Sequence, residues 1–315
     1  MFVVFGRVLA IFMLILIGFV ANRTGVLPDA SRKHLTNLML CITAPCMAAQ
    51  SLYSKELSDE VITATIQVLL GSIVYFIIVT VIAFVMVRGL KFKPKQEWGI
   101  YIVAIACINT GFMGFPITKA IFGDDIFYLM VIENIILCTY LYSISPILLY
   151  VGRDDKPTGS LAMLKSIFNP CTIGIIIGVV MLILGIKPPT AIDEVVTSLS
   201  EATIPLSMII VGVQLGASNI LSIFKNKYIN ITNIVSMVLI PIITFFIVDQ
   251  IDVLLPEVKL ILVFGSVFPT AVAPAAIAEK QNLDATRLAE IVSVTTVTSL
   301  IMIPIVAAFL MGYYC

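Results

Sequence analysis

The sequence predicts an all-α integral membrane protein with ten transmembrane helices, arranged as two inverted five-helix repeats in which helices 4 and 9 are broken. Three observations predict this class. Of the 315 residues, 60% are hydrophobic and only 12% are charged, against roughly 25% charged residues in soluble domains. The hydrophobic residues gather into about ten stretches near the ~20 residues that cross a bilayer as a helix. Small and polar residues also recur at a constant interval.

The ten apolar stretches define the predicted spans. Each is close to the length needed to cross about 30 Å of hydrocarbon. We place them at residues 2–22, 34–54, 61–87, 98–122, 126–150, 164–186, 191–216, 229–249, 258–280 and 286–312.

An internal repeat divides the chain into two halves. Six residue pairs are each separated by 160 positions: Gly18 and Gly178, Gly25 and Gly185, Pro28 and Pro188, Pro45 and Pro205, Thr110 and Thr270, Asp124 and Asp284. We therefore expect a first five-helix repeat at 1–150, a short cytoplasmic linker at 151–163 and a second repeat at 164–315. Five spans are an odd number, so the second repeat must enter the membrane from the opposite side and the repeat is inverted, as in many secondary transporters.

The fourth and ninth spans contain residues that interrupt a helix. "NTGFMGFP" at 109–116 combines two glycines with Pro116, which donates no N–H and clashes with the preceding turn. "FPTAVAP" at 268–274 lies about 160 residues later, and in that register Pro274 corresponds to Gly114. Backbone groups freed by such breaks must face protein or a polar cavity. A packing kink is the alternative, but the clustering and the symmetry favour functional breaks.

The two breaks predict a binding site. Pro116 and Pro274 suit the first position of a second half-helix, whose N-terminal partial charge attracts an anionic group such as a carboxylate. The Asn109 side chain and the hydroxyls of Thr110 and Thr270 could coordinate a cation or polar atoms of the substrate. The candidate substrate-binding residues are Asn109, Thr110, Gly111, Gly114, Pro116, Pro269, Thr270, Ala271 and Pro274.

Charged and polar residues near the breaks have two interpretations each. Glu133 and Asn134 lie in the fifth span, where a carboxylate is costly unless it is paired or hydrated, so they are candidates for proton or cation coupling. Alternatively, Glu133 lies near the outer interface beside a lysine. Lys119 either attracts an anion or extends its ammonium to the interface.

Residues at helical spacing in the tenth span also allow two interpretations. Glu290, Ser293 and Thr296 share one face and could line a pathway, or could bond within their own bundle. Gln50 and Gln214 are weaker cavity candidates.

The charge pattern predicts the orientation and excludes other classes of protein. Of the 19 lysines and arginines, 14 fall in loops near 23–33, 88–95, 153–165, 225–227 and 280–287 on one side of the ten spans. The positive-inside rule then places both termini outside the cytoplasm of a cell-membrane protein. Zero formal net charge argues against nucleic-acid binding. The six cysteines lack C-x-x-C spacing, and we expect no metal and no cofactor.

At these residues the chain resembles the auxin efflux carrier family, which includes the plant PIN-type exporters and bacterial malate or malonate permeases. The resemblance covers ten spans, short loops, "NTGFMGFP" and "FPTAVAP". It implies the fold of bile-acid/sodium symporters, in which the broken helices 4 and 9 cross at the substrate site. By the same resemblance, spans 1, 2, 6 and 7 form a scaffold, often dimeric, and spans 3–5 and 8–10 form a moving domain. The long central loop of the plant exporters is reduced here to about 151–163.

The leading hypothesis is a secondary transporter, acting as an exporter of a small organic anion such as a mono- or dicarboxylate, by alternating access. One alternative is a sodium-coupled symporter, for which Glu133, Asn134, Asn109 and Glu279 could supply a cation cage. A transporter-like sensor is another. An enzyme is disfavoured because the sequence has no G-x-S-x-G, H-E-x-x-H or P-loop motif, and its only histidine is at a membrane edge.

Overall fold

The computed structural model describes residues 2–154, 168–217 and 226–314. Most of the predicted linker at 151–163 and the start of the sixth span at 164–167 lie outside the described residues. In the first half the elements are α1 (Phe2–Arg23), α2 (Asp29–Leu38), η1 (Met39–Thr43), α3 (Ala44–Tyr53), α4 (Asp59–Gly89), η2 (Lys95–Glu97), α5 (Trp98–Ala106), η3 (Thr110–Gly114), α6 (Phe115–Phe122), α7 (Asp124–Ser143) and α8 (Ser145–Leu148). In the second half they are α10 (Pro170–Leu184), α11 (Thr190–Ala217), α13 (Lys227–Ile234), η5 (Val235–Leu239), α14 (Ile240–Asp249), α15 (Pro256–Gly265), α16 (Ala273–Lys280) and α17 (Thr286–Tyr314).

The described chain is helical throughout, which confirms the predicted class of an all-α membrane protein. Its described residues contain no β-strand, only one isolated backbone bridge. Six continuous helical segments in this part are long and apolar enough to cross a membrane: Asp29–Tyr53, Asp59–Gly89, Asp124–Ser143, Thr190–Ala217, Lys227–Asp249 and Thr286–Tyr314. Two further apolar helical segments, Leu9–Arg23 and Pro170–Leu184, are shorter. The predicted spans at 98–122 and 258–280 are each divided into two helices.

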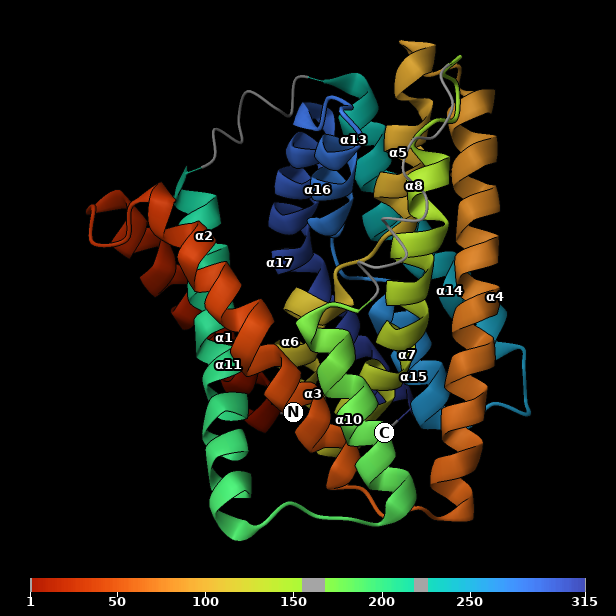
Figure 1. The fold of residues 1–315 in the computed structure, drawn as a ribbon. Coiled ribbons are helices and arrows are strands. Elements are labelled where there is room, and N and C mark those ends of the chain that lie inside the picture. The colour runs from red at the N-terminus through yellow and green to blue at the C-terminus, as the bar shows by residue number, and fades with distance from the viewer. Residues whose placement is uncertain (1, 155–167, 218–225, 315) are drawn as a thin grey trace. The chain divides into compact units, whose positions relative to one another are not determined.

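Contacts between residues group the chain into two compact units (ribbon in Figure 1). Unit 1 contains Met1–Ile66, Gly111–Ile135 and Phe168–Ser218, and unit 2 contains Gln67–Thr110, Ile136–Ile167 and Asn219–Cys315. Unit 1 therefore holds spans 1, 2, 6 and 7, the group implied by the resemblance. It differs from that expectation by also including the start of α4, most of η3, α6 and the first part of α7. The chain passes from one unit to the other between Thr110 and Gly111, inside the first helix break.

Close helix packing in unit 1 follows the 160-residue repeat. In Figure 1, α1 runs beside α11, and α3 packs against α10. A Cβ added to Gly18 of α1 would overlap the backbone of Ile209 in α11. A Cβ added to Gly178 of α10 would come within 2.9 Å of the backbone of Ala49 in α3. Gly178 lies 160 positions after Gly18, and Ala49 lies 160 positions before Ile209. The same helix contact therefore occurs twice, with the two halves of the chain exchanged.

The ends of α1 and α10 also match. Gly25 has φ +79° and Gly185 has φ +64°, a left-handed conformation that glycine adopts without steric cost. Pro28 and Pro188 follow three residues later in each half and prevent the helix from continuing. The paired glycines of the sequence repeat therefore have one structural cause, a helix C-cap.

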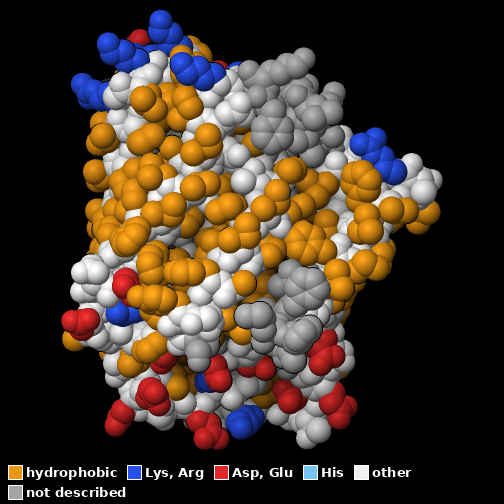
Figure 2. Space-filling view, turned by 180° about the vertical axis from the view of Figure 1, so that it is seen from behind, with side chains coloured by type: hydrophobic (Ala, Val, Ile, Leu, Met, Phe, Trp, Pro, Cys, Tyr) orange, Lys and Arg blue, Asp and Glu red, His pale blue; other side chains and the backbone are white. Residues whose placement is uncertain are grey.

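In unit 2, α4 is apolar on its buried face and on its exposed face. Phe76, Val79, Ala83 and Val87 are buried against the unit, whereas a row at four-residue spacing is exposed: Ile73, Ile77, Val81 and Val85. A helix that is hydrophobic all round is stable only in a large core or in a membrane. Figure 2 shows one face of the molecule covered by hydrophobic side chains, with Lys and Arg gathered toward one end and most Asp and Glu toward the other.

Candidate functional site at the interrupted helices

The first interruption lies where the sequence predicts it. Helix α5 ends at Ala106, Cys107 is extended with φ −90° and ψ 97°, and the helical path resumes as the π-helical turn η3. Two glycines and the missing N–H of Pro116 weaken an ordinary α-helix here, and wider π turns are a common response to such a defect. Helical turns begin at Thr110, so Pro116 is not the first residue of the half-helix as predicted. It is the second residue of α6.

The second interruption is longer. Helix α15 ends at Gly265 and α16 begins at Ala273, with Pro269 between them. Pro274 is the second residue of α16, the same place that Pro116 has in α6. The repeat pairs Pro274 with Gly114 at an interval of 160 residues, whereas the proline that has the same place in α6 is Pro116, 158 residues earlier.

Within unit 2 the two interruptions pair through their backbones. The Asn109 N–H donates to the Pro269 carbonyl at 2.8 Å, and the Ala271 N–H donates to the Cys107 carbonyl at 2.8 Å. Ile108 and Thr270 lie opposite each other as a single antiparallel bridge. Each segment donates one bond and accepts one, so the arrangement is locally two-fold symmetric. The pairing satisfies backbone groups that would be costly to leave bare in a membrane.

Thr270 holds this junction together. It is 1% exposed, its hydroxyl donates to the Ala104 carbonyl at 2.7 Å, and its N–H donates to the Thr295 hydroxyl at 3.2 Å. The Ala104 carbonyl is one of the last of α5 and has no helical partner because the helix stops. The predicted ligand hydroxyl of Thr270 is thus committed to the protein as a donor, although its oxygen can still accept a bond.

The other predicted site residues near the junction are mostly buried. Asn109 is 7% exposed and Thr110 is fully buried. The full set of predicted residues divides at the unit boundary. Unit 2 holds Asn109, Thr110, Pro269, Thr270, Ala271 and Pro274, and unit 1 holds Gly111, Gly114, Pro116, Glu133 and Asn134.

In unit 1, Gly111 lies beside Asn134. A Cβ added to Gly111 would be 3.2 Å from the Asn134 amide nitrogen, tighter than most real contacts. Asn134 is 2% exposed and its neighbour Glu133 is 3% exposed. Glu133 is the tenth of the 20 residues of α7, at the middle of the helix rather than at an end. Glu133 is therefore a buried carboxylate at the middle of a helix that is long and apolar enough to cross a membrane.

Comparison with known proteins identifies the family. A family described as "membrane transport protein" matches residues 3–158 and 156–307, which together are nearly the whole chain. The chain belongs to this family. The match also confirms the resemblance to auxin efflux carriers drawn from the two helix breaks.

Two relatives of this membrane transport protein come from archaea. An uncharacterized transporter of Methanothermobacter thermautotrophicus is 27% identical over 212 residues, covering 66% of this chain and 67% of the relative. An uncharacterized transporter of Methanocaldococcus jannaschii is 25% identical over 304 residues, covering 94% of this chain and 95% of the relative. The similarity to the second relative extends over both halves of the sequence repeat.

Several polar residues singled out in the sequence have structural partners in this membrane transport protein. The Lys119 ammonium is 3.3 Å from the exposed carboxylate of Asp124 and 5.6 Å from the ring centre of Phe127. This places the charge at the end of α6, as expected of a lysine that extends to the interface. Gln50 donates to the Thr197 hydroxyl at 2.6 Å within unit 1.

The predicted stripe of α17 also bonds locally. Glu290 pairs with Arg287 at 2.5 Å, Ser293 donates to the Ala289 carbonyl and Thr296 to the Val292 carbonyl. The residue of α17 that contacts the junction is Thr295, which sequence reasoning missed. It lies one position before Thr296 in a run of similar residues, and only its burial against Thr270 distinguishes it.

Proposed function

We propose that this membrane transport protein is a secondary transporter, an exporter of a small organic anion such as a mono- or dicarboxylate. Substrate binds at the junction of helices 98–122 and 258–280 and is exposed alternately to the two sides of the membrane. The observation that carries the proposal is the reciprocal backbone pairing at Ile108 and Thr270, found in a member of a transport family. Paired, discontinuous helices near the middle of the bilayer are the usual setting of transporter binding sites.

The fold that we propose has ten spans, with repeats at 1–150 and 164–315 joined by the linker at 151–163. Three features support an inverted repeat: the exchanged contacts of Gly18 and Gly178, the matched caps at Gly25 and Gly185, and the locally two-fold pairing. Two halves related in this way can exchange conformations, which opens one central site first to one side and then to the other.

The anionic class of substrate is supported by helix polarity. The first N–H groups of a helix lack helical acceptors and carry about half a positive charge in total. In η3 these groups belong to residues 110–113. At the start of α16, Pro274 has no N–H and the Ala275 N–H donates to the Val272 carbonyl at 3.1 Å, so η3 supplies most of them. A carboxylate would accept bonds from such groups without a buried lysine or arginine. The proposed substrate-binding set remains the one predicted: Asn109, Thr110, Gly111, Gly114, Pro116, Pro269, Thr270, Ala271 and Pro274.

Glu133 and Asn134 are the proposed coupling residues. Asn134 contacts the start of η3 at Gly111, so a change in the protonation or cation binding of Glu133 would act next to the helix break. We also propose a homodimer in the cell membrane with both termini outside the cytoplasm, as the family resemblance and the positive-inside rule imply.

Transport by the purified chain in liposomes tests the proposal. Flux of labelled mono- and dicarboxylates is measured under imposed substrate, proton and sodium gradients. We expect Asn109→Ala and Pro116→Ala to reduce flux strongly, whereas Pro304→Ala, which changes a proline inside α17, leaves most of it. Absence of carboxylate flux under every gradient would overturn the proposal, as would equal loss in all three variants.

Sodium coupling of the bile-acid symporter type is a second candidate, favoured by the buried carboxylate and amide of Glu133 and Asn134. Sodium-dependent thermal stabilisation that is lost in Glu133→Gln would select it. Stabilisation and flux that depend on pH but are the same in sodium and in potassium would select proton coupling.

A further inference from the structure

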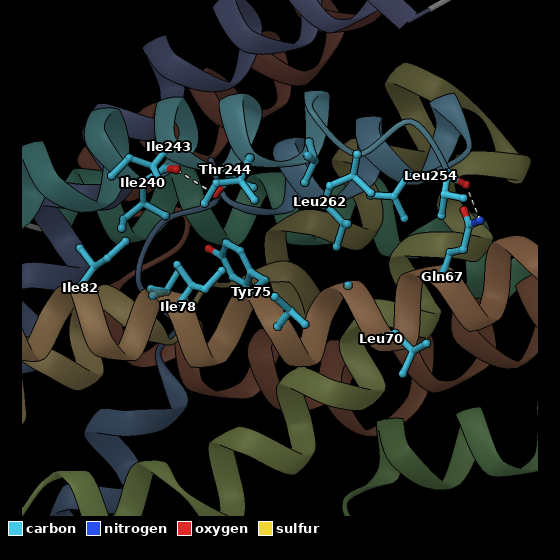
Figure 3. Close-up of a pocket in the computed structure, with 17 residues that line it drawn as sticks. Gln67, Leu70, Tyr75, Ile78, Ile82, Ile240, Ile243, Thr244, Leu254 and Leu262 are labelled. Carbon is cyan, nitrogen blue, oxygen red and sulfur yellow. Dashed lines mark hydrogen bonds between the residues drawn. The ribbon is translucent and has the colours of Figure 1, made fainter.

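Unit 2 has an apolar groove that none of the residues at the two helix interruptions lines. It lies between α4 and α14, and its cavity volume is about 270 Å³. In Figure 3, Tyr75 and Ile78 of α4 face Ile240 and Thr244 of α14 across the groove, and Leu262 of α15 lies alongside. All the residues that line the groove belong to unit 2.

A glycine helps to open the groove. Gly71 of α4 lines it, and a Cβ at this position would come within 2.7 Å of the Leu262 side chain. Outward from this point the groove walls are exposed hydrophobic side chains, including Leu70 at 60%, Val74 at 52% and Ile247 at 37%. Since α4 and the segment Lys227–Asp249 are both long and apolar enough to cross a membrane, the groove faces lipid rather than water.

The lining offers almost no polar surface to an occupant. The Gln67 amide donates to the Val253 carbonyl at 2.9 Å and accepts from the Leu255 N–H at 2.9 Å. The Thr244 hydroxyl donates to the Ile240 carbonyl at 2.8 Å. Tyr75 is only 8% exposed. An occupant must therefore be a hydrocarbon, because it would find few partners for its own polar groups.

The groove is longer than the hydrocarbon of one leaflet, so one lipid chain can lie along it. On α4 the groove runs from Gln67 to Ile82, which at about 1.5 Å per residue is roughly 22 Å. One leaflet of a bilayer contributes about 15 Å of hydrocarbon, half of the ~30 Å core. The Gln67 end is closed by the segment 250–255, which exposes Gln250 and Asp252 where a polar headgroup would lie.

We propose that this groove is a binding site for one acyl chain of a membrane phospholipid, with the headgroup beside the segment 250–255. The acyl chain fills the space beside Gly71, which has no side chain, and covers the exposed walls of α4 and α14. The lipid thus binds at a defined site instead of exchanging freely like the lipids around the other helices.

Photo-crosslinking tests the site. The chain is reconstituted in phosphatidylcholine and phosphatidylglycerol vesicles that contain a phosphatidylcholine with a diazirine in its acyl chain, and labelled peptides are mapped by mass spectrometry. We expect more label on residues 67–82 and 240–254 than on α10, none of whose residues lines this groove. Val74→Trp, which fills the groove, should lower this label roughly tenfold, the factor expected when about two methylene groups lose their apolar contacts.

Two controls separate the site from ordinary lipid contact. Ile77→Trp adds the same side chain to the exposed face of α4 outside the groove and should leave the labelling unchanged. Ile247→Trp fills the groove from α14 and should reproduce the loss if Val74→Trp fails to fold. Equal label on the groove and on α10, or crosslinks from the groove to a second copy of the chain, would overturn the assignment.

Discussion

At the scale of single residues, the junction depends on Thr270, whose side chain and backbone bond to two different helices. Its hydroxyl caps the end of α5 at Ala104, and its N–H is bonded to Thr295 of α17. The sequence identified Thr270 through its repeat partner Thr110 and its place beside two prolines. It could not show that the hydroxyl closes a helix end, because that bond joins residues 166 positions apart.

Thr270→Val should destabilise the protein by about 1–3 kcal/mol, because it leaves the buried Ala104 carbonyl without its donor. Thermal unfolding in detergent measures the change. Thr24→Val is the matched control: the Thr24 hydroxyl also donates to a backbone carbonyl, that of Val20 at 2.9 Å, but Thr24 is exposed and water can replace it. Equal stability of Thr270→Val and wild type would contradict the role given to this hydroxyl.

At the scale of helices, close approach and caps set the positions of α1, α3, α10 and α11. Small residues permit such approach in membranes, where there is little hydrophobic force to bring helices together. The sequence predicted the two helix breaks because glycine and proline act locally. It did not predict that helical turns restart at Thr110, since the backbone pairing of residues 107–109 with Pro269 and Ala271 decides where the extended segment ends.

Gly18→Ala should destabilise unit 1 by about 1–3 kcal/mol, the usual cost of overpacking, because the added methyl group would overlap the backbone of Ile209. Its repeat partner Gly178→Ala should have an effect of the same sign. Gly6→Ala is the control, since nothing lies within 4 Å of a Cβ at that position in the same helix. Unfolding midpoints of the three variants provide the measurement, and a loss in Gly6→Ala as large as in Gly18→Ala would refute the packing argument.

The start of α17 carries a pH-dependent cap. Hydrogen bonds from the Thr286 side chain and backbone hold the pKa of the Asp284 carboxyl below its usual value. A lowered pKa means that this stabilisation is present above the ordinary aspartate pKa of about 3.9 and is lost as the pH falls through the value in the folded protein.

We expect wild type to lose more stability on acidification below about pH 4 than Asp284→Asn, which retains a cap but no titrating group. Because Asp284 is exposed, the difference should be small, below about 1 kcal/mol. Parallel unfolding curves of the two proteins across this range would count against the cap.

At the scale of the whole molecule, composition determined the class. Hydrophobic stretches long enough to span a bilayer and the low charge content predicted a helical membrane protein, and the structure and the family agree. The number of spans was harder to establish, because the divided helices α5–α6 and α15–α16 do not form continuous segments of spanning length. The division into units was not visible in the sequence either, since α5 and α6 belong to one predicted span, 98–122, and yet fall in different units.

Orientation is testable on intact cells. With ten spans and the positive-inside rule, residues near either terminus should react with a membrane-impermeant thiol reagent, using single cysteines introduced into a cysteine-free variant. A cysteine in the basic segment 88–95 should react only after the cells are opened. Labelling of the termini only in opened cells would reverse the assigned orientation.

The joint between the interrupted helices is made by main-chain atoms alone at Cys107, Asn109, Pro269 and Ala271. All residues have a peptide group, so side chains at these positions can be substituted without breaking these hydrogen bonds. The exception is a change of Asn109 or Ala271 to proline, which would remove an N–H that donates there. Side chains at these four positions can therefore vary while the architecture persists, which under the proposed function makes them the places to alter selectivity.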